Sequence, residues 1–149
     1  MAICTFFGHK DTPKEIEPTL RSALIDLIIN KDTHLFYVGN QGNFDNMVIK
    51  NLQQLSEHYT NIKYYVVLSY MPVAKNIITT NHFDTIYPEG LEKTPLKFAI
   101  DKRNRWMIDK SDYVVTYVIH NFGGASKFKT LSEKKGKTVI NLSEINSFI

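Results

Sequence analysis

The feature that most constrains the fold of this 149-residue chain is an apolar run that ends at a glycine and leads into a helical pattern. Residues 35–38 form the run, Gly39 ends it, and Asn40, Gln41 and Gly42 precede a helical pattern that begins near residue 44. A strand that passes through glycines into a helix places backbone N–H groups at the helix N-terminus, which favours phosphate binding. We therefore predict an anion-binding loop here, with Asp45 in the first helical turn.

Two other apolar runs end in the same way. Residues 3–7 end at Gly8, His9 and Lys10, and residues 113–119 are followed by a loop that contains Gly123 and Gly124. Three such strand ends at one edge of a sheet would form a pocket of nucleotide size. In open α/β sheets ligands bind at this carboxyl edge, near the point where the strand order reverses.

Strand and helix patterns alternate along the chain, which predicts a single α/β domain over residues 1–149. Apolar runs and period-3.6 patterns predict strands at 2–7, 34–38, 63–70, 112–119 and 137–142, and helices from residue 18 to about 30, at 44–59, from 95 through 107, and at 124–135. Strands that alternate with helices favour parallel pairing with helices on both faces. The expected architecture is a Rossmann-like three-layer sandwich with a mostly parallel, five-stranded sheet.

Residues 71–94 interrupt this rhythm with a long polar stretch. A connection of this length in a compact domain is usually functional or mobile, so we interpret it as a long loop or lid. It carries Asp84 and Glu89, whose carboxylates could face a ligand.

Arg103 falls on the apolar stripe of the helix that begins near residue 95, and Asn104 lies at the border of that stripe. A buried arginine needs a partner. One interpretation is an internal salt bridge, for example with an acid of the long loop. The other is an arginine that contacts a phosphate or carboxylate of a ligand.

Composition restricts the classes of function. The net charge of +3 permits an anionic ligand. The sequence lacks the dense basic stripe that is typical of a nucleic-acid-binding domain. The single Cys4 excludes an internal disulfide and a cysteine-clustered zinc site, and the five scattered histidines predict no metal site. No apolar run is long enough to span a membrane, and no signal peptide is recognisable, so we expect a cytoplasmic protein. We also expect that the protein holds no cofactor.

Several acids could act on a glycosidic bond as acid, base or nucleophile: Asp11, Asp45, Asp84 and Glu89. The alternative for Asp11 is a turn or cap residue. The alternative for Asp45 is a first-turn acid that interacts with the helix dipole.

Five motifs occur in order along almost the whole chain: 8–10 (GHK), 39–45 (GNQGNFD), 87–92 (YPEGLE), 103–107 (RNRWM) and 123–125 (GGA). Together they resemble the SLOG superfamily, in particular its small stand-alone DUF1273-like members of prophages and Firmicutes. The resemblance implies a Rossmann-like domain that binds nucleotides or nucleotide-derived signals, and several such domains are sensors in antiviral systems. It places the ligand over Gly8, His9, Gly39, Gln41, Gly42, Asp45, Gly123 and Gly124, with Arg103 nearby.

The LOG enzymes of this superfamily hydrolyse the N-glycosidic bond of nucleoside monophosphates and carry the signature Pro-Gly-Gly-x-Gly-Thr-x-x-Glu. In this chain the Gly-Thr pair is absent after Gly124, and Thr130 stands where the catalytic glutamate is expected. This departure favours binding over catalysis, so we predict no catalytic residue.

The first hypothesis is a binder of a second messenger, an ADP-ribose-like or cyclic nucleotide signal, that acts as sensor or sponge. The second is an enzyme that cleaves an N-glycosidic bond. The third is a DNA-associated protein like the DNA-processing family, although we expect no nucleic-acid partner. SLOG relatives commonly associate, which favours a homo-oligomer. We also expect that Gly42→Glu removes ligand binding and leaves the fold intact.

Overall fold

The computed structural model describes residues 1–69 and 84–145. Its strands are β1 (Ala2–Gly8), β2 (Thr33–Val38), β3 (Lys63–Val67), β4 (Asp84–Ile86), β5 (Tyr113–Tyr117) and β6 (Thr138–Asn141). Its α-helices are α1 (Glu17–Asn30), α2 (Gly42–Leu55), α4 (Leu96–Lys110) and α5 (Gly124–Lys134). Short 3₁₀ turns lie at η1 (Lys14–Ile16), η2 (Leu91–Lys93) and η3 (Leu142–Glu144).

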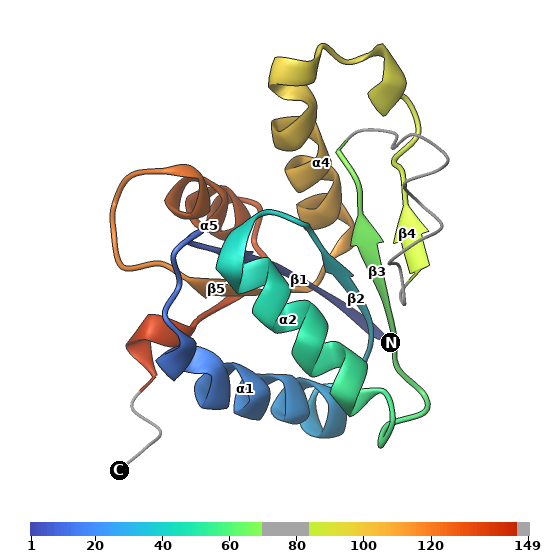
Figure 1. Cartoon of the computed structure of the whole chain (residues 1–149), viewed down its shortest axis with the longest axis vertical. Helices are drawn as coiled ribbons and strands as arrows, with labels where there is room; N and C mark the ends of the chain where they lie inside the picture. Colours follow the sequence, from blue (N-terminus) through green and yellow to red (C-terminus); the bar gives the residue numbers. More distant parts are fainter. Residues whose placement is uncertain (70–83, 146–149) are drawn as a thin grey trace.

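The six described strands form one sheet in the order β4-β3-β2-β1-β5-β6, and every neighbouring pair is parallel. Helices α1 and α2 lie together over one face of this sheet, as Figure 1 shows, and α4 and α5 pack on the other side. The predicted Rossmann-like three-layer α/β fold is thereby confirmed.

Alternate residues of the strands fill the two cores, because successive strand side chains point to opposite faces. Phe6 and Val66 pack in the core under α1 and α2, whereas their neighbours Phe7 and Val67 pack under α4 and α5. Burial on both faces explains the near-continuous apolar runs in the sequence.

The sheet has one strand more than the five expected from the sequence. The additional strand is β4, which pairs with β3 in the register Tyr65↔Asp84 and lies at the edge of the sheet. Its three residues are at most half-buried, so they produce no apolar run that periodicity could detect. Part of the predicted 71–94 loop is therefore a strand, and residues 70–83 lie outside the described residues.

The strand order reverses between β1 and β5, since the chain proceeds from β1 to β4 in one direction and then returns through α4 to β5 on the other side of β1. Such a switch point opens a crevice at the carboxyl ends of the two strands. Among the described helices, none combines the length and apolar character that crossing a membrane requires.

Candidate ligand-binding site

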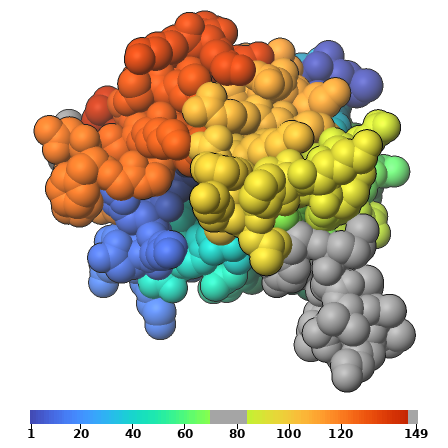
Figure 2. Space-filling model, turned by 90° about the horizontal axis from the view of Figure 1, so that it is seen from above, coloured from blue at the N-terminus to red at the C-terminus, as the bar shows by residue number. Residues whose placement is uncertain are grey.

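A cavity of about 370 Å³ lies at the carboxyl edge of the sheet, around the end of β1. In the view from above, the segment after β1, the start of α2, helix α4 and the β5–α5 loop meet on this face (Figure 2). The cavity is lined by Phe6, Phe7, Gly8, His9, Lys10, Asp11, Gln41, Asp45, Ile100, Arg103, Asn104, Met107, Gly124, Ala125 and Phe128.

Eight of the predicted site residues lie in this wall: Gly8, His9, Lys10, Gln41, Asp45, Arg103, Asn104 and Gly124. Asn40 is not part of the wall, but its Oδ1 accepts a hydrogen bond from Arg103, and Gly39 lies against Asp45 and Arg103. Gly42 contacts the backbone of Lys10, and Gly123 precedes α5. The structure thus brings most of the candidates together from three strand ends.

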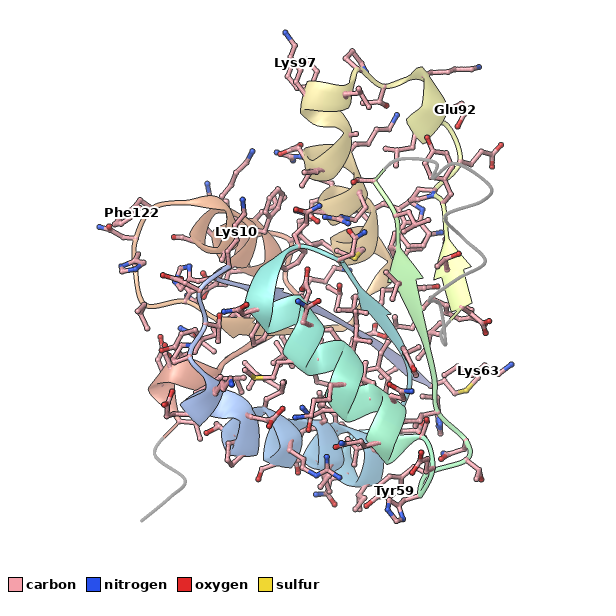
Figure 3. The ribbon with its side chains drawn as sticks, viewed as in Figure 1. Lys10, Tyr59, Lys63, Glu92, Lys97 and Phe122 are labelled. Atoms are coloured by element: carbon pink, nitrogen blue, oxygen red, sulfur yellow. The ribbon has the colours of Figure 1, made fainter. Side chains whose placement is uncertain are left out.

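Asp84 and Glu89 do not line this cavity. Asp84 is exposed at the beginning of β4, beside Tyr65, and Glu89 is exposed after that strand. Figure 3 shows the two ends of the parallel strands. Lys10 and Phe122 lie near the start of α5, on the carboxyl side of the sheet, whereas Tyr59 and Lys63 lie on the opposite, amino side. Asp84 thus precedes the carboxyl end of its strand, and Glu89 follows that end without reaching the cavity wall.

Backbone N–H groups at the N-terminus of α2 are hydrogen-bonded to other groups of the protein. The N–H of Gln41 donates to Asp45 Oδ2 (2.9 Å), and the N–H of Asn43 donates to the carbonyl of Lys10 (2.8 Å). The bare N–H groups expected in the 39–45 loop are therefore already satisfied at these two positions.

Gly42 is also a structural requirement. Its φ of +88° lies in the left-handed region, and an added Cβ would come within 2.7 Å of the Lys10 Cα. The expectation that Gly42→Glu leaves the fold intact is wrong, because the substitution would strain this backbone contact.

The N-terminus of α5 is open. Gly123 has a φ of +90°, and an added Cβ at Gly123 or Gly124 would meet nothing within 4 Å. The first N–H of this region that bonds within the helix is that of Lys127, to the carbonyl of Gly123 (3.0 Å). The preceding N–H groups have no intrahelical acceptor, and Gly124 and Ala125 line the cavity. Of these two helix N-termini, only that of α5 has N–H groups without an intrahelical acceptor beside the cavity.

Arg103 is 1% exposed and forms a buried hydrogen-bond network. Its Nε donates to Asn104 Oδ1 (2.8 Å), and its Nη1 donates to the carbonyl of Val67 (2.9 Å) and to Asn40 Oδ1 (3.2 Å). All these acceptors are uncharged, so the internal salt bridge proposed as one interpretation is not found among the described residues. The guanidinium keeps its charge beside the cavity.

Asp45 is the buried carboxyl of the cavity. Burial raises its pKa to about 6, although the hydrogen bond from the Gln41 N–H and the nearby Arg103 both favour the charged form. Burial likewise lowers the pKa of Arg103, and the field of Asp45 opposes this effect. The carboxyl is thus poised to change its charge near neutral pH.

Aromatic rings extend from the rim of the cavity. The rings of His9 and His120 are 4.9 Å apart, and His120 stacks on Phe122 at 4.8 Å. The N–H of Ile119 donates to His9 Nε2 (3.0 Å), which requires the neutral ring, and burial together with His120 lowers the pKa of His9. His120 is exposed, and Phe122 remains two-thirds exposed in this arrangement.

Sequence reasoning missed the apolar half of the wall. Ile100, Met107 and Phe128 line the cavity, yet in the sequence they belong to the helix stripes that predict core packing. Met107 and Phe128 are buried core residues, as the stripes predict, whereas Ile100 is 43% exposed. Ala125 could have been found, because it follows the glycine pair directly.

Thr130, which the resemblance to LOG enzymes aligns with their glutamate, lies on a different surface. It lines a second cavity with Arg105, Phe122, Lys127 and others, between α4 and α5. The acidic side chains in the wall of the main cavity are Asp11 and Asp45. No cluster of three or more metal-ligating side chains occurs among residues 1–69 and 84–145.

No protein-family model and no curated protein sequence matches the chain. Its structure is similar to the X-ray structure of DNA processing protein A (DprA) from Streptococcus pneumoniae, with a TM-score of 0.67 and 16% sequence identity. The match covers 93% of this chain and 49% of that protein, so the chain spans about half of its length. At this identity the likeness shows the fold.

Proposed function

We propose that the cavity binds a nucleotide-derived ligand, such as an ADP-ribose-like or cyclic nucleotide signal, and that the protein is a sensor or sponge of the SLOG type. One observation carries the proposal. Buried polar side chains from α2 and α4 and the open N-terminus of α5 line the same cavity at the switch point of a parallel sheet. The fold shared with DNA processing protein A supports a SLOG-type domain.

The composition of the wall matches such a ligand. The volume lies within the range of small-molecule pockets, which combine apolar surface with a few convergent polar groups. The N–H groups of Gly124 and Ala125 suit a phosphate. Among the apolar residues of the wall, Ile100 is 43% exposed and supplies apolar surface for a flat ring, whereas Met107 and Phe128 are core residues behind it.

The second candidate is hydrolysis of an N-glycosidic bond, and the position of Asp45 is the observation that favours it. A carboxyl with a pKa of about 6 inside the cavity could act as general acid or base. Thr130 provides no carboxyl and lines another surface. Binding without catalysis remains our proposal.

The third candidate is an association with DNA, which the DprA-like fold favours. Binding of a DNA backbone weakens steeply between 50 and 200 mM salt, because it releases counterions. A ligand enclosed by a cavity of this size would show a shallower dependence.

A thermal-shift screen tests the proposal with mono-, di- and cyclic nucleotides, NAD, ADP-ribose and its cyclic forms, at 50 and 200 mM salt. A ligand at a hundred times its dissociation constant adds about 2.7 kcal/mol to the free energy of unfolding, or very roughly 5–10 °C for a domain of this size. Ligand recovered intact supports binding. A released base supports the enzyme, and the absence of any shift contradicts the proposal.

A further inference from the structure

We propose that His9 acts as a pH-sensitive latch: its neutral imidazole holds the β5–α5 loop (residues 118–123) beside the cavity, and protonation of the ring releases the loop. The inference goes beyond the proposed function, because it concerns a wall of the cavity and does not depend on which ligand the cavity takes. It follows from the hydrogen bond between the Ile119 N–H and His9 and from the exposure of the rest of the loop.

The β5–α5 loop is fixed at its base by groups that do not titrate. The Val118 N–H donates to Asn141 Oδ1 (2.9 Å), and the Val118 carbonyl accepts from Asn141 Nδ2 (3.0 Å) and from Ser143 Oγ (2.9 Å). Amide and hydroxyl groups of this kind keep their hydrogen-bonding roles across the pH range in which proteins are folded. Val118 is therefore a fixed point that a change of pH does not release.

Beyond Val118 the loop depends on one histidine. The Ile119 N–H donates to His9 Nε2 (3.0 Å), and within the described part of the chain no other hydrogen bond joins residues 119–122 to another segment. Apolar packing contributes little, because the side chains of Ile119 and Phe122 are 57% and 66% exposed. Figure 1 shows this loop at the left margin of the molecule, beside α5. Loss of the His9 hydrogen bond would therefore free most of the loop.

The histidine side of the latch is held in place. The His9 carbonyl accepts from both the N–H (3.2 Å) and the Oγ1 (2.6 Å) of Thr12, which is buried. The centroid of the His9 ring lies 6.1 Å from that of Tyr117, in an edge-to-face arrangement, and 4.9 Å from that of His120. The loop, rather than His9, is therefore the part that moves when the hydrogen bond breaks.

Protonation reverses the role of His9 Nε2. In the neutral ring Nε2 accepts from Ile119 and the proton is on Nδ1, whereas in the charged ring both nitrogens donate. Two donors then face each other and the hydrogen bond is lost. A charge on His120 as well would add repulsion between the two rings. Acidification therefore weakens both contacts between His9 and the loop.

The groups around His9 set the pH at which the latch opens. Burial and His120 lower the pKa of His9 from its ordinary value of 6.5, and Asp11 opposes them. The closed loop therefore binds the proton less tightly than the open loop, so closure is favoured above pH 6.5 and weakens as the pH falls below it. The other charged side chains of the same cavity wall are Lys10, Asp45 and Arg103.

The latch connects pH to the shape of the cavity. The loop leads through Gly123 into α5, and Gly124 in the first turn of that helix lines the cavity together with His9. Release of the loop would therefore loosen the wall on the α5 side, next to the open helix N-terminus.

The experiment measures amide hydrogen exchange of the ¹⁵N-labelled protein by NMR at pH 7.5 and pH 5.0, without ligand. Each rate is converted to a protection factor relative to the unstructured chain at the same pH. From pH 7.5 to 5.0 the protection factor of the Ile119 amide should decrease by about threefold or more, whereas that of Val118 should stay constant.

Two variants assign the effect to His9. His9→Gln should remove the pH dependence at Ile119, because the glutamine amide does not titrate and its oxygen can accept in place of Nε2. His58→Gln, the same change at an exposed histidine outside the cavity, should leave the pH dependence as in the wild type. Circular dichroism and the melting temperature establish that both variants are folded before their exchange rates are compared.

Three results would overturn the latch. An Ile119 amide that is equally protected at both pH values shows that protonation does not release the loop. An equal loss of protection at Val118 shows that acid loosens the fold as a whole. A pH dependence that persists in His9→Gln assigns the titration to another group. Because no ligand is present, none of these results bears on the proposed function.

Discussion

Asp45→Asn should make the protein more stable at alkaline pH, and the size of the effect follows from the burial of this carboxyl. Its pKa is about 6 in the folded protein, against 3.8 for an unperturbed aspartate. The folded state therefore binds the proton more tightly than the unfolded state, so this carboxyl contributes stability that is fully present below about pH 4 and is lost as the pH rises to about 6. A difference of about two pKa units corresponds to about 3 kcal/mol.

The amide of the variant keeps an oxygen that can accept from the Gln41 N–H but carries no charge at any pH. Urea denaturation at pH 4.5 and at pH 8 measures the difference between the variant and the wild type. We expect a small difference at pH 4.5 and a gain of up to about 3 kcal/mol at pH 8.

The exposed Asp84 provides the control, since Asp84→Asn should change the free energy of unfolding little at either pH. An Asp45→Asn protein that is no more stable than the wild type at pH 8 would show that the carboxyl is not held in a desolvated position. A stability gain that is equal at both pH values would also refute the reasoning, because it would not arise from ionisation.

The remaining predictions concern the walls of the cavity. Gly8→Ala should destabilise the protein by about 1–3 kcal/mol in chemical denaturation, because the new Cβ would come within 2.2 Å of the Phe44 ring, whereas Gly124→Ala should cost less. Arg103→Met should lower the free energy of unfolding by about 3–5 kcal/mol, because the loss of the guanidinium leaves two buried oxygens and one part-buried oxygen unpaired; a loss below 1 kcal/mol would contradict the network. An NMR titration of His9 should give a pKa below 6.5, and a value above it would contradict its neutral ring.

The architecture was largely predictable because burial on both faces of a parallel sheet leaves long apolar runs in the sequence. The strands at β1, β2, β3, β5 and β6 all carry this signal. β4 does not, because its residues Asp84–Ile86 are exposed or half-buried at the edge of the sheet. Its pairing depends on the neighbouring strand β3, which no local pattern reveals.

A cavity at this edge of the sheet was predictable as a region, but the detailed chemistry of its wall was not. Glycines at strand ends located the carboxyl edge correctly, and Arg103 was recognised as a buried charge that needs partners. Which helix N-terminus is open depends on long-range contacts, such as the Lys10 carbonyl that caps Asn43. The partners of Arg103 come from α4 itself and from the ends of β2 and β3, and such contacts are set only when the chain folds.

The most direct test of a nucleotide site at the carboxyl edge is amide chemical-shift mapping of the ¹⁵N-labelled protein with ADP-ribose and with AMP. Our account predicts that the largest shifts occur at Gly124 and Ala125, with further shifts at Gly8 and Gln41. Shifts confined to the opposite edge of the sheet, around Asp32 and Lys137, would contradict it, as would saturating ligand that shifts no amide of the cavity.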